Sequence, residues 1–421
     1  MTCHFWTPAS FAAITAGRWL VPPSNPSEPL SGVCIDSRCL VPGAAFVAIR
    51  GERHDGHAYV GQAASRGAGL ALVERGLDEP APSLPVLRVP STVGALQALA
   101  RRYRDLLGLS GCRVLSVSGS NGKTTTRHLI HHVLSQAGIR GTQSPRSFNN
   151  QLGVPLTLLA AQPEDGFVVC EMGTNHPGEL AALAALVRPD LAVVTSIGEE
   201  HLEFFGDLAG VAREEAAVLG FVRAGGALVL PESRWLPVPL GPPSAPAFSV
   251  HRFDLDPQAD QLPLPGVHNR LNASAAAVVA RLLGVGEPAI GAALASAVAP
   301  PLRGEVLFAA ERHRPTVLND AYNANPSSMT VALGALKAWE GRRVAILGDM
   351  LELGERSPAA HRKVAAWALE TAERCVFVRP RFLAARPQAL IGHGRDSGAV
   401  AFYPDWSPSV LDQIVASLTA Q

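Results

Sequence analysis

A glycine-rich loop between a short apolar run and a helix-forming segment constrains this chain more than any other feature. Residues 113–118 favour a buried strand, and residues 119–125 follow it, with a helix beginning inside the motif. Small residues let backbone N–H groups converge on phosphate oxygens, while the helix N-terminus and Lys123 add positive charge. Thr124 can also ligate magnesium. The residues predicted to bind the phosphates of ATP or GTP are Gly119, Ser120, Asn121, Gly122, Lys123, Thr124 and Thr125.

The loop alone does not define a reaction. Val117 stands where a general phosphate-binding loop has its first glycine, so this is a shortened variant. An ordinary strand-to-helix turn without a nucleotide is the simpler interpretation, although the strand-loop-helix context favours the phosphate site. A kinase or a switch protein could carry the same loop. The reaction must therefore be inferred from the rest of the chain.

The whole sequence predicts an α/β fold in three domains. Short apolar runs alternate with Ala/Leu-rich amphipathic segments, as expected when helices cross over a mainly parallel sheet. The 421 residues exceed one ordinary core, since a domain takes roughly 150 residues. Boundaries are expected near residues 107 and 301, giving domains at 1–107, 108–301 and 302–421. The middle domain would hold the phosphate loop on a mainly parallel sheet flanked by helices.

The clearest predicted elements follow from hydrophobic periodicity. The expected strands are residues 45–49, 113–118, 167–171, 191–197, 227–230, 316–320 and 343–348. The expected helices are residues 93–107, 124–137 and 329–339. Loops are expected at 22–29 and 236–246, where prolines accumulate.

Composition excludes several classes of protein. Lys+Arg and Asp+Glu are equal at 36 each, which argues against nucleic acid as the main partner. No apolar stretch approaches the ~20 residues of a membrane-spanning helix, and the N-terminus lacks a signal-peptide pattern, so the cytoplasm is the expected location. The 6 cysteines form no C-x-x-C pair, which predicts reduced thiols. A monomer is expected.

Several segments, in order and spacing, resemble the Mur ligases, cytoplasmic enzymes that lengthen the peptide on UDP-N-acetylmuramic acid. Besides the Gly-Lys-Thr-Thr-Thr loop they are residues 171–173 (Glu-Met-Gly), 196–203 (Ser-Ile-Gly-Glu-Glu-His-Leu-Glu), 265–273 (Pro-Gly-Val-His-Asn-Arg-Leu-Asn-Ala) and 303–305 (Arg-Gly-Glu). Residues 147–150, 319–326 and 347–354 resemble the branch of the family that adds D-Ala-D-Ala. Residues 36–38 and 55–57 resemble the domain that binds the UDP substrate.

This resemblance implies a fold, a reaction and its cofactors. The C-terminal domain would be Rossmann-like. The enzyme would join D-Ala-D-Ala to UDP-N-acetylmuramoyl-tripeptide in peptidoglycan precursor synthesis, with ATP and Mg²⁺ as cofactors. ATP would phosphorylate the peptide carboxylate, and the incoming amine would attack the acyl phosphate through a tetrahedral intermediate. Both steps build negative charge, so positioned cations and metal ions should carry most of the catalysis.

The resemblance also implies roles for particular residues near the nucleotide. Glu171 would be a further magnesium ligand, and His201 would hold a second ion. Arg303 would reach the γ-phosphate and Asp320 the ribose or phosphates, which requires domain closure because they lie beyond the linker. Catalysis would rest on Lys123, Glu171, His201, Arg303 and a further carboxylate.

The remaining candidates would bind the adenine or the substrates. The adenine would face His268, Asn269 and Asn272. The two asparagines could simply cap a helix, which is compatible with a position beside the adenine. The uridine diphosphate would meet Ser37 and Arg38, unless residues 36–38 are a solvated turn. The candidates for the peptide are Asn149 and Asn150, and those for D-Ala-D-Ala are Tyr322, Asn323, Asn325 and Asp349.

The further carboxylate is Glu215, which departs from the family pattern. Mur ligases typically carry, fourteen positions after the metal-binding histidine, a lysine whose amine takes up carbon dioxide to become a carbamate. Glu215 stands fourteen positions after His201 and offers an anionic oxygen ligand directly. A solvated helix charge is the alternative, and Glu214 would take the role if the register slips by one.

Two other departures put family contacts in doubt. Leu230 runs into Pro231-Glu232-Ser233, where the family has an Asn/Asp-rich turn, so a nucleotide contact from that turn is not expected. The family's late Lys-Gly-Ser motif is missing, with residues 393–396 (His-Gly-Arg-Asp) in that neighbourhood. His128, His131 and His132 share one helix face but lack a carboxylate or cysteine partner, which favours a helix surface over a metal site.

Three other functions stay open from sequence. The chain could be the tripeptide-forming Mur ligase or a folylpolyglutamate synthetase, although residues 319–326 argue against both. It could also be a nucleotide-binding scaffold without turnover. The intact Lys123, Thr124, Glu171 and His201 argue against a scaffold, because a binding module needs no second metal position.

Overall fold

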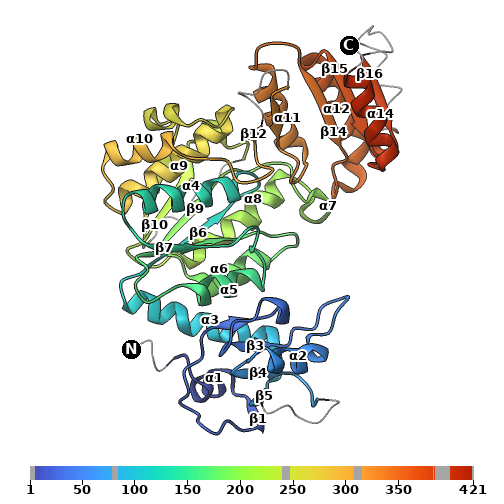
Figure 1. Cartoon of the computed structure of the whole chain (residues 1–421). Coiled ribbons are helices and arrows are strands. Elements are labelled where there is room, and N and C mark those ends of the chain that lie inside the picture. The colour runs from blue at the N-terminus through green and yellow to red at the C-terminus, as the bar shows by residue number, and fades with distance from the viewer. Residues whose placement is uncertain are drawn as a thin grey trace.

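The computed structural model describes residues 5–77, 84–238, 247–307, 315–382, 384 and 399–419. In these ranges the chain builds three α/β units that follow one another along the long axis of the molecule (Figure 1). The predicted fold class is confirmed. Most of the predicted loop 236–246 and all of residues 393–396 lie outside the described ranges. No helix within those ranges combines the length and apolar character that a membrane crossing requires.

The N-terminal unit contains a five-stranded sheet in the order β1-β5-β4-β3-β2. All neighbouring strands are parallel except β1, which runs antiparallel to β5. Its elements are α1 (Pro8–Thr15), β1 (Arg18–Val21), β2 (Val33–Cys34), β3 (Ala45–Val47), α2 (Val60–Ser65), β4 (Leu70–Val73) and β5 (Val86–Arg88).

The middle unit is built on a six-stranded, wholly parallel sheet in the order β11-β10-β9-β6-β8-β7. Its strands are β6 (Arg113–Ser118), β7 (Gly141–Gln143), β8 (Phe167–Glu171), β9 (Leu191–Val194), β10 (Ala227–Pro231) and β11 (Ser249–Phe253). Its helices are α3 (Thr92–Leu109), α4 (Lys123–Gln136), α5 (Gly153–Ala160), α6 (Glu179–Val187), α7 (Leu202–Phe205), α8 (Leu208–Ala216), α9 (Val267–Leu282) and α10 (Glu287–Ala295).

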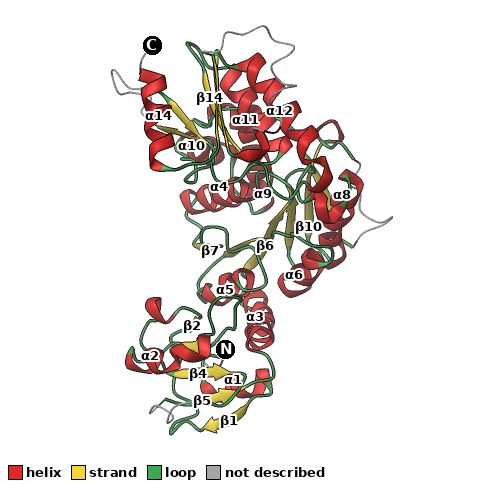
Figure 2. Ribbon diagram, turned by 90° about the vertical axis from the view of Figure 1, so that its right-hand side faces the viewer, coloured by secondary structure: helices red, strands yellow, loops and turns green. Residues whose placement is uncertain are grey.

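Helices cover both faces of this middle sheet (Figure 2). Val114 on β6 packs with the cluster that includes α3, α5 and α6, whereas the next residue, Leu115, packs with the cluster that includes α4, α9 and α10. Successive side chains of a strand point to opposite faces, so a strand buried on both faces is a continuous apolar run. That property made β6, β8, β9 and β10 recognisable in the sequence, whereas the two edge strands, β7 and β11, were not predicted.

The C-terminal unit combines an antiparallel strand pair with a three-stranded parallel sheet in the order β14-β15-β16. Its elements are β12 (Glu305–Leu307), β13 (Val317–Asn319), α11 (Pro326–Lys337), β14 (Val344–Gly348), α12 (Ser357–Thr371), β15 (Arg374–Val378), β16 (Val400–Tyr403) and α14 (Pro408–Thr419). Helices flank the parallel sheet, as in a Rossmann-like arrangement (Figure 1).

Two predicted elements end or begin elsewhere for reasons that affect the site. The strand expected to reach residue 197 ends at Val194. Just beyond it, the hydroxyl of Thr195 donates to the backbone carbonyls of Ser118, at the end of β6, and of Asn121, in the phosphate loop. Helix α11, expected from residue 329, begins at Pro326, because Asn325 caps it in a capping box with Ser328. Both shifts bring polar side chains to the same end of the middle sheet.

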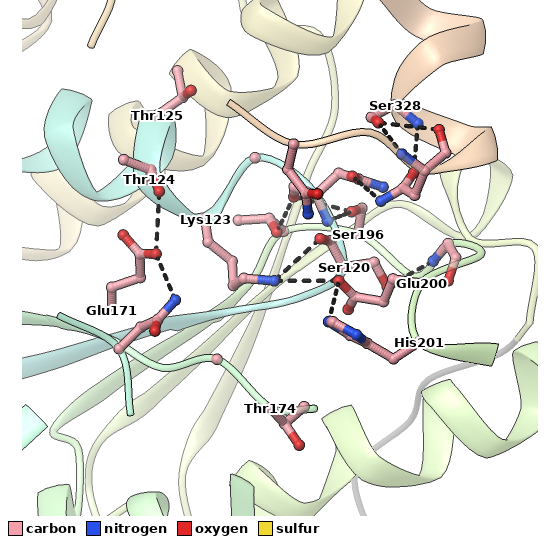
Figure 3. Close-up of a pocket in the computed structure, with 18 of the residues that line it drawn as sticks. Ser120, Lys123, Thr124, Thr125, Glu171, Thr174, Ser196, Glu200, His201 and Ser328 are labelled. Carbon is pink, nitrogen blue, oxygen red and sulfur yellow. Dashed lines mark hydrogen bonds and ion pairs between the residues drawn. The ribbon is translucent and has the colours of Figure 1, made fainter. Parts of the chain in front are cut away.

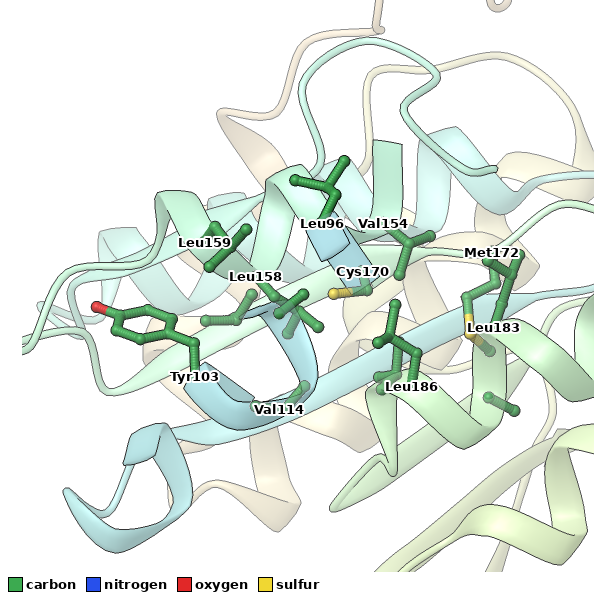
Figure 4. Close-up of a cluster of buried hydrophobic side chains, with 14 of the residues drawn as sticks. Leu96, Tyr103, Val114, Val154, Leu158, Leu159, Cys170, Met172, Leu183 and Leu186 are labelled. Carbon is green, nitrogen blue, oxygen red and sulfur yellow. The ribbon is translucent and has the colours of Figure 1, made fainter. Parts of the chain in front are cut away.

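Helix α3 joins the N-terminal unit to the middle one. Leu96 and Tyr103 pack among buried side chains of β6, α5, β8 and α6 (Figure 4). The Tyr103 hydroxyl donates to the carbonyl of Ala161 at 2.8 Å. The same hydrophobic cluster includes Leu70 and Leu72 of β4. The boundary expected near residue 107 therefore falls within a helix whose apolar face serves both cores.

A buried guanidinium fixes α3 against the middle unit. Arg104 is 1% exposed and donates to the backbone carbonyls of Val187 and Arg188 at 2.7 and 2.8 Å and to Asp190 Oδ2 at 2.9 Å. Asp190 Oδ2 also accepts from the backbone N–H of Val114 at 2.8 Å. The guanidinium is satisfied only while this carboxylate is present.

The Asp190→Ala variant is expected to lose about 3–5 kcal/mol of unfolding free energy, because it leaves the Arg104 charge buried without its partner. Urea unfolding followed by circular dichroism measures the loss. Asp105→Ala is the matched control. Asp105 lies on the same helix as Arg104 and pairs with Arg188, but the side chains of Asp105 and Arg188 are both substantially exposed. That variant should lose no more than about 1 kcal/mol. Equal losses in the two variants would contradict the structural role of Asp190.

Candidate functional site

The phosphate loop leaves the carboxyl end of β6 and enters α4 at Lys123. Gly119 has φ +115°, and a Cβ there would lie 2.3 Å from the hydroxyl oxygen of Thr195. Gly122 has φ +82°, and its Cβ would lie 2.3 Å from Asn272 Oδ1. Both positions require glycine for backbone conformation and for space. The loop shape predicted from sequence is therefore held by residues far away in the chain.

The amine of Lys123 is held against its own loop. It donates to the carbonyls of Gly119 and Ser120 at 2.6 and 3.1 Å, and it lies 3.5 Å from Glu200 Oε2 (Figure 3). Lysine is a compact cation on a flexible stem, so it can exchange these neutral carbonyl partners for phosphate oxygens.

One cavity of about 1030 Å³ opens beside this loop. The sequence-predicted residues that line it are Ser120, Asn121, Gly122, Lys123, Thr124, Thr125, Asn149, Asn150, Glu171, His201, His268, Asn269, Asn272, Arg303, Asp320, Tyr322, Asn323 and Asn325. The predicted residues that do not line it are Gly119, Glu215, Ser37, Arg38 and Asp349. The cavity therefore brings together candidates from the middle and C-terminal units.

Thr124 and Glu171 meet on one side of the cavity (Figure 3). The Thr124 hydroxyl donates to Glu171 Oε1 at 3.1 Å, and the Asn149 amide donates to the same oxygen at 3.2 Å. Glu171 Oε2 accepts from Nε of Arg127 at 3.2 Å. Arg127 also donates to the carbonyl of Arg146 at 3.0 Å, which connects the carboxylate to the loop that carries Asn149. The Glu171 charge is thus buried but compensated.

Two further carboxylates lie near Lys123. Burial raises the pKa of Glu215 to about 7, against the lowering effects of Lys123, Ser118 and the backbone of Gly119. Burial also raises the pKa of Glu200 to about 8, although Lys123 lowers it. The sequence prediction missed Glu200, and the available signal was its position just before His201 in the loop that follows β9.

The structure distinguishes Glu215 from its neighbour. Glu214 accepts hydrogen bonds from the backbone N–H groups of Gly178 and Leu180 at 2.8 and 2.9 Å and from Thr174, so it caps the start of α6. Glu215 is 2% exposed, and its Oε2 has no hydrogen-bond partner among the described residues. The possibility of a solvated helix charge is excluded for both. Glu215 is the carboxylate that faces the phosphate loop.

His201 lies between Glu200 and the C-terminal unit. Its Nε2 is 4.0 Å from Glu200 Oε2, and its Nδ1 contacts Glu352 Oε2. Burial lowers the pKa of His201, while Glu352 raises it. In the described ranges no three His, Cys, Asp or Glu side chains are close enough together to hold a metal ion. Magnesium, however, is usually bound by one or two carboxylates together with substrate phosphates and water.

The C-terminal unit reaches the phosphate loop through two segments. Arg303 Nη2 lies 3.5 Å from the Thr124 hydroxyl, and its guanidinium carbon is 3.7 Å from the centre of the Tyr322 ring. The Asn325 amide donates to Asn121 Oδ1 at 2.9 Å. Burial raises the pKa of Asp320 to about 6, partly offset by Arg303. Arg303 therefore lies beside Thr124 of the phosphate loop, where the phosphates of a nucleotide are expected.

The segment expected to face adenine lines the same cavity. Burial lowers the pKa of His268 to about 4, and its Nδ1 has no hydrogen-bond partner within the described ranges. The Asn269 amide donates to the carbonyl of Pro265 at 2.8 Å, whereas Asn272 accepts from the hydroxyl of Thr126 at 3.2 Å. Neither asparagine caps α9, which starts after Gly266 without a side-chain cap, so the capping interpretation is wrong.

Four other candidates lie in different surroundings. Arg38 is exposed and pairs with Asp36, while the Ser37 hydroxyl donates to Gln62. Asp349 accepts from the backbone N–H groups at 381 and 382, so it holds that segment inside the C-terminal unit. Asn150 lines the cavity but also accepts from the first backbone N–H groups of α5.

The histidines on α4 contact different elements. His131 Nε2 lies 3.2 Å from the carbonyl of Gly141, and His132 Nε2 lies 2.9 Å from the carbonyl of Ala293. His131 therefore contacts β7, whereas His132 contacts α10. Each serves packing between α4 and a neighbouring element.

Comparison with known proteins identifies the family. Family models match residues 29–104 (Mur ligase family, catalytic domain), 117–236 (Mur ligase middle domain) and 303–415 (Mur ligase, glutamate ligase domain). A protein of Escherichia coli named UDP-N-acetylmuramoyl-tripeptide--D-alanyl-D-alanine ligase is 36% identical over 362 residues, covering 80% of this chain and 78% of that protein. This chain belongs to the Mur ligase family. The resemblance seen in the sequence is thereby confirmed.

Other relatives and solved structures agree with a Mur ligase. The Bacillus subtilis protein of the same name is 31% identical over 82% of this chain and 79% of its own length. A crystal structure of MurF from Acinetobacter baumannii superposes with a TM-score of 0.83 at 27% identity, covering 99% of this chain and 93% of that one. A MurF ligase from Thermotoga maritima in complex with ADP shares the fold, with a TM-score of 0.71 at 23% identity over 92% of this chain and 96% of that one.

Proposed function

We propose that this Mur ligase joins D-Ala-D-Ala to UDP-N-acetylmuramoyl-tripeptide, consuming ATP, in peptidoglycan precursor synthesis. The relatives described above carry the name of this activity. The observation that carries the proposal is the single cavity lined by both the phosphate loop and the segment from Arg303 to Asn325. A ligase that activates an acid and then transfers it to an amine needs ATP, acid and amine in one enclosure.

The proposed reaction has two steps. An oxygen of the tripeptide's terminal carboxylate attacks the γ-phosphorus of ATP, the bond to the β-phosphate oxygen breaks, and ADP leaves. The amine of D-Ala-D-Ala then attacks the acyl carbon, a C–N bond forms, and phosphate leaves as the amine loses a proton. Both steps gather negative charge beside Lys123 and Arg303. Positioned cations in an enclosed site stabilise such charge most strongly.

The residues present fit magnesium. Thr124 and Glu171 offer oxygens beside the phosphate loop, and Glu215 has a buried oxygen without a hydrogen-bond partner among the described residues. Burying an ionised carboxylate is costly unless a cation compensates it. Magnesium, when bound, would neutralise phosphate charge. We assign Thr124 and Glu171 to one ion, and His201 and Glu215 to a second.

No lysine of this chain is placed to form the carbamate that Glu215 is proposed to replace. Its only lysines are Lys123, Lys337 and Lys363. Lys123 belongs to the phosphate loop, while Lys337 stacks on the Trp367 ring at 4.8 Å in the C-terminal unit. Lys363 lies on α12 and is exposed. These positions support Glu215 as the anion that other family members obtain from a carbamoylated lysine.

The proposal divides the work among three domains. Residues 1–107 would bind the UDP part of the substrate, 108–301 ATP, and 302–421 the incoming dipeptide. The three family matches fall inside these ranges. Ser37 and Arg38 remain candidates for the UDP although they lie outside the cavity, because a tripeptide separates that end of the substrate from the reacting carboxylate. We also propose that the protein is a monomer and is located in the cytoplasm, where ATP is available.

Phosphate release tests the proposed function. Purified enzyme with ATP and Mg²⁺ would be given, in separate reactions, D-Ala-D-Ala with UDP-N-acetylmuramoyl-tripeptide, a diamino acid with the UDP-linked dipeptide, or glutamate with a folate. We expect stoichiometric phosphate and ligated product with D-Ala-D-Ala. Faster turnover with the diamino acid on a dipeptide acceptor, or with glutamate on a folate acceptor, would instead identify one of the other ligases of this fold.

Arg303→Ala is expected to lower kcat by about a hundredfold with little change in binding of the UDP substrate. Arg303 approaches the phosphate loop at Thr124 and lies far along the chain from the N-terminal unit. Steady-state kinetics and calorimetric titration of the UDP substrate measure the two effects. Arg362→Ala, a partly exposed arginine on α12, serves as the control. Equal losses in turnover and in UDP-substrate affinity would count against the assignment of Arg303 to the nucleotide.

A further inference from the structure

A contact between distant segments joins His201 to the C-terminal unit. The Glu352 carboxylate contacts Nδ1 of the His201 ring. The backbone carbonyl of Glu352 also accepts from the N–H of Glu203 at 3.3 Å. A Cβ on Gly354 would lie 3.5 Å from the Cα of Glu203. The turn at 352–354 therefore packs directly against the first turn of α7, which lies beside the C-terminal unit (Figure 1).

Both residues of the contact have backbones that are unusual for their types. His201 has φ +46° and Glu352 has φ +57°. Residues other than glycine adopt this left-handed region at a cost, and they keep it where surrounding contacts hold them there. The Glu352 side chain is 47% exposed, whereas that of His201 is 15% exposed. Glu352 could therefore be solvated, yet it turns toward the imidazole.

The contact determines which ring nitrogen of His201 keeps a lone pair that can bind a metal ion. Nδ1 must carry the hydrogen that is donated to the carboxylate, so in the neutral ring the lone pair is on Nε2. Nε2 lies 4.0 Å from Glu200 Oε2, and both residues line the cavity. A carboxylate that accepts from one ring nitrogen commonly orients a histidine whose other nitrogen binds a metal.

We propose that Glu352 is a positioning residue that sets the tautomer and orientation of His201, so that Nε2 faces the cavity only while the C-terminal unit is docked on the phosphate loop. The functional consequence rests on the proposed role of His201 as a metal ligand. Docking is also supported by Ser327, whose hydroxyl accepts from the N–H of Glu199 at 3.0 Å, and by the contact of Asn325 with Asn121. The device would link activation of the acid to presence of the domain that supplies the amine, limiting hydrolysis of the acyl phosphate.

The first test needs neither metal nor substrate. Two-bond ¹H–¹⁵N spectra of protein labelled on histidine, recorded where the ring is neutral, report which ring nitrogen carries hydrogen, and a His201→Gln variant assigns the signal. We expect the Nδ1–H tautomer in the wild type and a shift toward Nε2–H in Glu352→Ala. Glu352→Gln keeps an acceptor oxygen and should retain the wild-type tautomer. Glu355→Ala, which changes an exposed glutamate just after this turn, is the matched control.

Kinetics supply the second test. Glu352→Ala should lower kcat about tenfold to a hundredfold and raise the Mg²⁺ concentration for half-maximal rate, with KM for the UDP substrate unchanged. Glu352→Gln should recover much of the rate. An unchanged tautomer in Glu352→Ala would overturn the proposal, and so would a changed tautomer with unaltered kcat and Mg²⁺ dependence. Failure of the ligase assignment would appear separately, as a wild type that releases no phosphate with D-Ala-D-Ala.

Discussion

Replacing Lys123 by alanine is expected to lower ATP turnover by at least about a hundredfold while the protein stays folded. The amine touches only two carbonyls of its own loop and the carboxylate of Glu200, so no apolar core depends on it. Its loss removes the single lysine charge from the expected β- and γ-phosphate positions. Coupled measurement of ADP release, together with thermal unfolding, separates a catalytic effect from a structural one.

Lys363→Ala is the matched control for this prediction. Lys363 is exposed on α12, and the substitution removes the same charge and the same stem. Its turnover should equal that of the wild type. Ligation by Lys123→Ala at the wild-type rate would refute the assignment of the phosphate loop. Equal loss in both variants would show that net charge, rather than position, was responsible.

Glu215→Gln should lower turnover about tenfold to a hundredfold and weaken the dependence of the rate on Mg²⁺. The buried Oε2 lacks a hydrogen-bond partner in the described ranges, and glutamine supplies no charge for a cation. Wild-type activity should also be indifferent to added or depleted bicarbonate, because the chain has no lysine at this position. Initial rates across Mg²⁺ and bicarbonate concentrations measure both effects. Bicarbonate-dependent wild-type activity, or a fully active Glu215→Gln, would contradict the replacement.

The same substitution has a predicted effect on stability without metal. Because burial raises the pKa of Glu215 in the folded state to about 7 from its ordinary value of 4.5, the folded state binds more protons than the unfolded one between these values. Stability is therefore lost as pH rises through that range. Glu215→Gln should remove this loss and be as stable as the wild type or more so at pH above about 7. Glu214→Gln, which weakens the cap of α6, should instead lower stability and leave Mg²⁺ dependence unchanged.

Apolar runs and short motifs were sufficient to predict the elements whose structure depends on residues close together in the sequence. Strands β6 and β8 have the predicted bounds, because a strand buried on both faces is an uninterrupted apolar run. The phosphate loop was recognisable since its glycines and lysine act within a few residues of one another. The start of α11 was predictable from Asn325-Pro326 but was missed, because periodicity was followed instead of the capping signal.

Only the tertiary structure decided which side chains meet. The fourteen-residue spacing favoured Glu215, but successive residues of a helix point about 100° apart, so only the structure could exclude a one-residue slip to Glu214. The contact of Asn325 with Asn121 spans 204 positions, and that of Glu352 with His201 spans 151. Glu200 was overlooked because its contact with Lys123 likewise joins residues 77 positions apart. The sequence determined the local elements and the family's motifs, whereas the site depends on packing three units together, which brings distant residues to one end of a parallel sheet.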